Sequence, residues 1–187
     1  MKPSALLVTM NRYWGVANRL RDAAARAPRT IDVRVETPWS FDDVPRLLRS
    51  DVDLLALDGR GWAERDAAYF GTHHDLQLSP RRLRGEYGEG IVAPIVVFGF
   101  CHGGTDPFLN ALATVIDRPT TAFVGCTRHA RYDAAARVYP PLLAVLATLG
   151  TDPDPAEAHA QIKPLEQIFG PAWRTTLMSG YDAGRQR

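Results

Sequence analysis

A run of apolar, mostly β-branched residues after Pro94 constrains the fold of this chain more than any other feature. The segment Ile95-Val-Val-Phe98 shows no alternation of apolar and polar residues, so it predicts a strand buried on both faces. Such strands occur in parallel sheets that carry helices on both sides. The run leads into Cys101-His-Gly-Gly104, which places a thiol in a glycine-rich turn. We therefore expect an α/β protein whose central strand delivers a cysteine to one edge of the sheet.

The segments before this strand alternate between strand-like and helix-like patterns. Strands are expected at 5–10, 31–36 and 53–58, with helices at 16–27 and 40–49 between them. This βαβαβ order predicts a parallel sheet with right-handed crossovers. Residues 62–79 break the rhythm and predict a small hairpin or extended excursion. A fifth strand at 120–126 is followed by a long helix at 133–149, which Pro140 and Pro141 are expected to kink or split.

We expect one domain over residues 1–150, with residues 151–187 as a C-terminal helical appendage and tail of the same domain. A chain of 187 residues with 45% hydrophobic content is long enough to form one core. The net charge of +1 gives no support for a nucleic-acid or membrane partner. The sequence shows no signal-peptide pattern, no apolar run of membrane-spanning length and too few cysteines for a disulfide framework. These features favour a cytoplasmic protein with free thiols, and they leave its oligomeric state open.

Chemically active side chains follow several of the predicted strands at their carboxyl ends, where α/β sheets carry their sites. They lie in three segments: Asp58-Gly-Arg60, Cys101-His-Gly-Gly104 and Cys126-Thr-Arg-His129. A thiol becomes a nucleophile when a nearby cation or imidazole lowers its pKa. Backbone N–H groups near Gly103 and Gly104 are candidates for stabilising an oxyanion. Gly59 and Gly61 are expected in the loop that closes the third strand, at the same edge. For Asp58 and Arg60 we expect a surface ion pair that holds the loop, with substrate binding as the alternative.

The order of these segments resembles the caspase-like fold of clan CD cysteine peptidases, including bacterial CHAT-type domains. Residues 75–85 resemble the family segment before the cysteine strand, and Ile95 to Gly104 resemble that strand with its catalytic turn. Residues 121–127 and 138–150 resemble the next strand and its packed helix. The resemblance covers about Ala5 to Gly150. It implies a three-layer αβα fold with a mainly parallel sheet, a peptide or protein substrate, and Cys101 as the nucleophile.

The chain departs from this family where the general-base histidine is expected, because Gly59-Arg60-Gly61 stands there. Arginine stays protonated in proteins and cannot accept the thiol proton. Arg60 is then expected to lower the pKa of the Cys101 thiol or to bind a carboxylate. The base is left open between His73, His74 and His129, while His102 is expected to order the turn. An inactive caspase-like interaction module is the alternative function.

A second enzyme class fits the same turn. Gly99-Phe-Cys-His-Gly103 matches G-x-C-x-G, a cysteine version of the nucleophile elbow of α/β-hydrolases such as dienelactone hydrolases. That class needs an acid and a histidine on later strands, and no convincing strand is predicted after residue 124. No spacing typical of a metal site, a dinucleotide site or a P-loop occurs, so we expect no metal and no cofactor.

Overall fold

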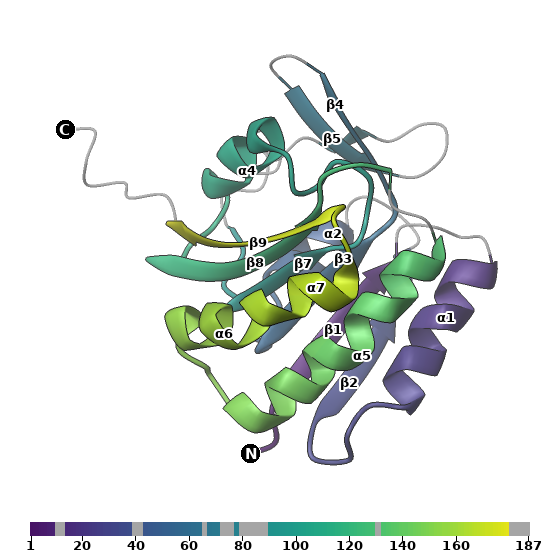
Figure 1. Ribbon diagram of the computed structural model, residues 1–187, viewed down its shortest axis with the longest axis vertical. Coiled ribbons are helices and arrows are strands. Elements are labelled where there is room, and N and C mark those ends of the chain that lie inside the picture. Colours follow the sequence, from purple (N-terminus) through teal and green to yellow (C-terminus); the bar gives the residue numbers. More distant parts are fainter. Residues whose placement is uncertain are drawn as a thin grey trace.

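A six-stranded sheet forms the centre of the protein, in the strand order β2-β1-β3-β7-β8-β9 (Figure 1). The computed structural model describes residues 1–9, 14–38, 43–64, 67–71, 77–78, 90–129 and 132–179. The first five neighbouring strands pair in parallel and β9 pairs antiparallel to β8. The strands are β1 (Ser4–Thr9), β2 (Asp32–Glu36), β3 (Leu54–Asp58), β7 (Ile95–Phe98), β8 (Thr120–Cys126) and β9 (Trp173–Ser179). The prediction of a three-layer α/β fold with a mainly parallel sheet is confirmed.

Helices cover both faces of the sheet, and each face has its own hydrophobic cluster. Successive residues of β1 separate between the two clusters: Leu6 and Val8 face one, while Ala5 and Leu7 face the other. This is the alternation that a pleated strand requires. Residues of α2 (Asp43–Leu48) and α4 (Asp106–Ala113) belong to the first cluster. Residues of α1 (Trp14–Ala25), α5 (Tyr132–Leu149) and α6 (Pro155–Ile162) belong to the second.

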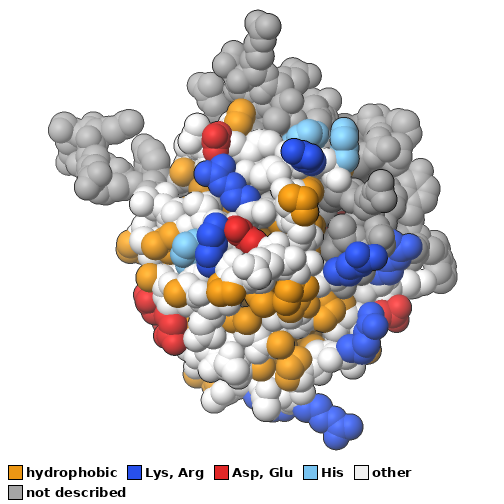
Figure 2. All heavy atoms as spheres, viewed as in Figure 1, with side chains coloured by type: hydrophobic (Ala, Val, Ile, Leu, Met, Phe, Trp, Pro, Cys, Tyr) orange, Lys and Arg blue, Asp and Glu red, His pale blue; other side chains and the backbone are white. Residues whose placement is uncertain are grey.

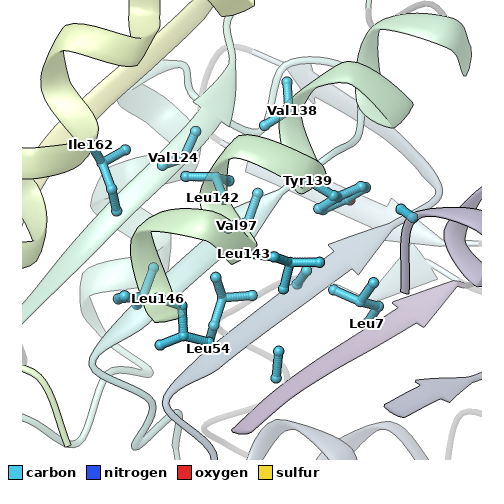
Figure 3. Close-up of a cluster of buried hydrophobic side chains, with 14 of the residues drawn as sticks. Leu7, Leu54, Val97, Val124, Val138, Tyr139, Leu142, Leu143, Leu146 and Ile162 are labelled. Carbon is cyan, nitrogen blue, oxygen red and sulfur yellow. The ribbon is translucent and has the colours of Figure 1, made fainter. Parts of the chain in front are cut away.

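Helix α5 supplies much of the second cluster, and Figure 3 shows its side chains directed at the strands. Leu142, Leu143 and Leu146 are almost completely buried. Although Pro140 and Pro141 lie inside it, α5 is one helix from Tyr132 to Leu149, so the predicted split does not occur. A proline in a helix removes one backbone hydrogen bond. Burial of each of these leucines contributes about 1.5–3 kcal/mol, which offsets that loss.

The C-terminal segment is part of the central fold, which corrects its description as a helical appendage. After α6 come the 3₁₀ turn Lys163–Leu165 and the short helix α7 (Glu166–Phe169). Strand β9 then pairs with the whole length of β8, from Cys126↔Trp173 to Thr120↔Ser179. The sequence prediction missed β9, which begins at a buried tryptophan and alternates between buried and exposed residues over its first half. Strand β9 thus completes the same sheet that β1, β2 and β3 begin.

Three strands between β3 and β7 form a separate antiparallel sheet, in the region where the break in the sequence pattern predicted a hairpin or extended excursion. Its strands are β4 (Arg60–Glu64), β5 (Ala67–Gly71) and β6 (Gln77–Leu78). Both β4 and β5 contact α4, so this small sheet lies beside the helix that follows Cys101 (Figure 1). Of the helix expected at 40–49, Asp43–Leu48 are helical, and residues 40–42 lie outside the described residues.

Candidate functional site

The turn that carries Cys101 begins where β7 leaves the sheet. The Gly99 N–H donates to the Leu57 carbonyl at 2.8 Å and so extends the pairing of β3 with β7 by one residue. Phe100 is buried and stacks on Phe98, with ring centroids 4.8 Å apart. Because Phe100 anchors the chain in the core, the next residue is held at the edge of the sheet. Cys101 is partly exposed there.

The turn is completed by a strained residue. His102 has φ = 64°, a left-handed conformation that is uncommon for residues other than glycine. Its carbonyl accepts hydrogen bonds from both the N–H and the hydroxyl of Thr105, at 3.1 Å and 2.8 Å. Helix α4 starts one residue later, at Asp106. These bonds stabilise the left-handed residue directly after the thiol, and such strain is found most often at functional sites.

The end of β8 holds the other side of the turn. The Gly104 N–H donates to the Cys126 carbonyl at 2.9 Å, and the His102 N–H donates to the Arg128 carbonyl at 3.0 Å. A Cβ atom on Gly104 would lie 2.6 Å from the Gly125 carbonyl oxygen, so this approach requires glycine. The turn after β7 and the carboxyl end of β8 are therefore in van der Waals contact.

Two histidines meet at this edge. The rings of His102 and His129 are in edge-to-face contact, with centroids 5.1 Å apart and planes at 77°. Figure 2 shows two histidine side chains gathered beside a basic side chain. Desolvation lowers the pKa of His102, and the charge of His129 lowers it further. His102 is therefore neutral over a wider pH range than a free imidazole, and a neutral imidazole can accept a proton.

The two cysteines differ in environment, although both lie at this edge and neither forms a disulfide. Cys126 is completely buried, and its thiol donates to the Arg128 carbonyl at 3.3 Å. Burial raises the pKa of Cys126, the Arg128 backbone lowers it by a smaller amount, and the charge of the nearby Cys101 raises it again. Cys126 is therefore kept as a thiol. Cys101 is the more accessible of the two thiols.

Asp58 is not on the surface, so the prediction of a surface ion pair with Arg60 is wrong. Its side chain is 4% exposed at the end of β3, and the Tyr139 hydroxyl of α5 donates to it at 3.2 Å. Burial raises the pKa of Asp58 to about 7, although the bond from Tyr139 lowers it. Sequence analysis missed Tyr139. The available signal was a carboxylate ending an otherwise apolar strand, because such a group needs a buried donor.

The glycines with predicted roles are placed as follows. The N–H groups of Gly103 and Gly104 donate to the carbonyls of Phe100, at 3.3 Å, and Cys126. Their role in stabilising an oxyanion stays a prediction. It requires the Gly103 N–H, which makes the longer of the two bonds, to leave the Phe100 carbonyl and donate to the oxyanion instead. Gly59 links β3 to β4, whereas Gly61 lies within β4 opposite Phe70 rather than in a loop. Pairing with β5 makes this segment a strand.

Three other predicted groups lie outside the described part of the structure, wholly or in their side chains. The backbone of Arg60 begins β4, but its side chain is not among those described, and His73 and His74 lie outside the described residues. Within the described part of the chain, no group of three or more His, Cys, Asp or Glu side chains is arranged to hold a metal ion. The same part contains no helix that is both long and apolar enough to span a membrane.

Comparisons with known proteins identify no family. No protein-family model matches the chain, and no curated protein matches its sequence. Twelve chains of solved structures are similar to it. One of them, described as "Structure of Protease", shares 10% sequence identity at a TM-score of 0.47. The similarity covers 73% of this chain but only 31% of that one, so this chain spans about a third of the neighbour's length.

Proposed function

We propose that this protein is a cysteine hydrolase of peptide bonds with Cys101 as its nucleophile. One observation carries the proposal: the partly exposed thiol stands at the carboxyl edge of the sheet, and the residue after it contacts the ring of His129. Nucleophilic catalysis by cysteine requires an accessible thiol with an imidazole nearby. The sequence resemblance of the same turn to clan CD peptidases supports this assignment.

His129 is the proposed base, and His102 is proposed to orient it. His129 is exposed and follows Arg128, whose carbonyl bonds the turn directly after Cys101. In the proposed reaction, an imidazole takes the thiol proton and the sulfur attacks the peptide carbonyl. The C–N bond then breaks, the leaving amine receives the proton, and water hydrolyses the thioester. This assignment selects His129 from the histidines that the sequence left open.

The test is hydrolysis of a fluorogenic peptide library by the wild type and four variants. Cys101→Ala and His129→Ala are expected to lower kcat/KM by at least about a hundredfold. Cys126→Ala is the matched control for the first, and His159→Ala in α6 is the control for the second. Both controls should keep most of the activity. Hydrolysis that survives in Cys101→Ala would rule the proposal out.

An interaction module without catalysis is the second candidate, because the N–H groups of Gly103 and Gly104 already donate to main-chain carbonyls. In that case the wild type and Cys101→Ala would bind library peptides equally and neither would cleave them. The α/β-hydrolase alternative is less favoured. In a nucleophile elbow the nucleophile itself occupies the strained turn. Here the positive φ belongs to His102 and not to Cys101.

A further inference from the structure

The two cysteine-bearing segments are packed directly against each other. Gly104, in the Cys101 turn, and Gly125, beside Cys126, approach so closely that a Cβ atom on either would meet the other's backbone at 2.6–2.8 Å. A hydrogen bond of 2.9 Å from the Gly104 N–H to the Cys126 carbonyl fixes this contact. The relative position of the two segments is therefore set by backbone contacts that do not involve either sulfur.

One carbonyl group connects the surroundings of the two thiols. The Arg128 carbonyl accepts two hydrogen bonds, one from the Cys126 thiol at 3.3 Å and one from the His102 N–H at 3.0 Å. His102 is bonded directly to Cys101. The Cys126 sulfur and the backbone of the Cys101 turn thus converge on a single oxygen atom. In agreement with this proximity, the charge of Cys101 contributes to raising the pKa of Cys126.

The accessibilities of the two thiols are opposite. Cys101 is partly exposed, whereas Cys126 is completely buried behind the turn. An oxidant from solvent therefore reaches Cys101 first. A cysteine sulfenic acid next to a second thiol condenses with it to a disulfide, which protects the first sulfur from irreversible oxidation.

We propose that Cys126 is the resolving thiol in a reversible oxidation of Cys101 by hydroperoxides. The Cys101 thiolate attacks the peroxide oxygen, the O–O bond breaks, and a sulfenic acid and hydroxide form. The Cys126 sulfur then attacks the Cys101 sulfur, and the sulfenic oxygen leaves as water. The two thiols lose two electrons in total, and the peroxide gains them. The product is a Cys101–Cys126 disulfide.

Formation of this bond requires a local rearrangement at Cys126. A disulfide needs Cα atoms about 4.4–6.8 Å apart and a specific torsion about the S–S bond. When its sulfur attacks, Cys126 must give up its hydrogen bond to the Arg128 carbonyl. The consequence for catalysis rests on the proposed function: the disulfide would block the nucleophile until a reductant restores it. The oxidation itself does not depend on peptidase activity.

The test uses the full chain treated with hydrogen peroxide and then alkylated with N-ethylmaleimide under denaturing conditions. Cleavage before Asp106 and Asp117 separates the two cysteines, so a disulfide appears as a linked pair of peptides. We expect this pair in the wild type, and we expect dithiothreitol to abolish it and restore labelling of Cys101. In Cys126→Ser and Cys126→Ala, the link should be absent and Cys101 should proceed to sulfinic acid.

Several results would overturn the inference. One is sulfinic acid at Cys101 in the wild type while Cys126 remains alkylated. Another is a disulfide that joins two chains on a non-reducing gel. The wild-type measurement needs no variant, so a misfolded Cys126 variant does not weaken it. A chain that forms the disulfide but cleaves no peptide would refute the proposed function and leave this inference standing. A chain that cleaves peptides but forms no disulfide would refute this inference and leave the proposed function standing.

Discussion

Replacing Asp58 by asparagine tests whether a carboxyl group buried beneath the candidate site controls the stability of the fold. Asp58 is the last residue of β3, and its hydrogen-bonding partner Tyr139 on α5 is almost completely buried. Burial penalises the charged carboxylate and raises the pKa of Asp58 from 3.8 to about 7. Asparagine has nearly the same shape and carries no charge at any pH. Its side-chain carbonyl still accepts the hydrogen bond from Tyr139.

The sign of the effect follows from proton linkage. Between pH 3.8 and about pH 7 the folded protein keeps the Asp58 proton, while the unfolded chain has lost it. The free energy of unfolding therefore falls as pH rises through this interval and levels off above it. Each pKa unit corresponds to about 1.4 kcal/mol, so the full loss from this group is about 4 kcal/mol. The Asp58→Asn variant lacks this loss.

The measurement is urea unfolding of wild type and variant between about pH 4.5 and about pH 8.5. We expect the variant to gain stability relative to the wild type by about 1.4 kcal/mol per pH unit below pH 7, with little further change above it. Asp51→Asn, at an exposed position before β3, controls for the loss of one negative charge. If the curves of wild type and Asp58→Asn stay parallel over the whole range, the reasoning about Asp58 is refuted.

Two further substitutions test the packing around the site. Gly99→Ala should lower the free energy of unfolding by about 1–3 kcal/mol, because its Cβ would lie 2.2 Å from the Tyr139 hydroxyl. Adding Tyr139→Phe should recover part of this loss, and strictly additive losses of the two substitutions in thermal unfolding would contradict the explanation. Thr121→Val should raise the free energy of unfolding by up to about 1 kcal/mol, because the buried Thr121 hydroxyl has no hydrogen-bond partner among the described residues. The matched variant Thr127→Val should lower the free energy of unfolding by a similar amount, because the Thr127 hydroxyl donates to the Ala172 carbonyl at 3.1 Å. Shifts of the same sign and size in the two variants would contradict the explanation.

Local pattern was enough to predict β7 and the place of Cys101 at its end. Four successive buried residues in Ile95–Phe98 match the expected absence of alternation. Pattern failed at β9, which lies after several helical turns and was interpreted as a tail. Its residues become a strand because β8 offers a free edge to pair with. Sequence analysis sees the propensity of a segment but does not see the edge that the segment completes.

In the candidate site, too, some features follow from local sequence and others only from the tertiary structure. The sequence by itself determined the chemistry at the sheet edge, because strand periodicity and the glycine-rich turn place Cys101 there. Only the tertiary structure decided that His102 meets His129, that Cys126 is buried behind the turn, and that Tyr139 bonds Asp58 across 81 residues of chain. The physical reason is that periodicity is set by neighbouring residues, whereas burial and the resulting pKa values are set by segments that meet only when the sheet and its helices assemble.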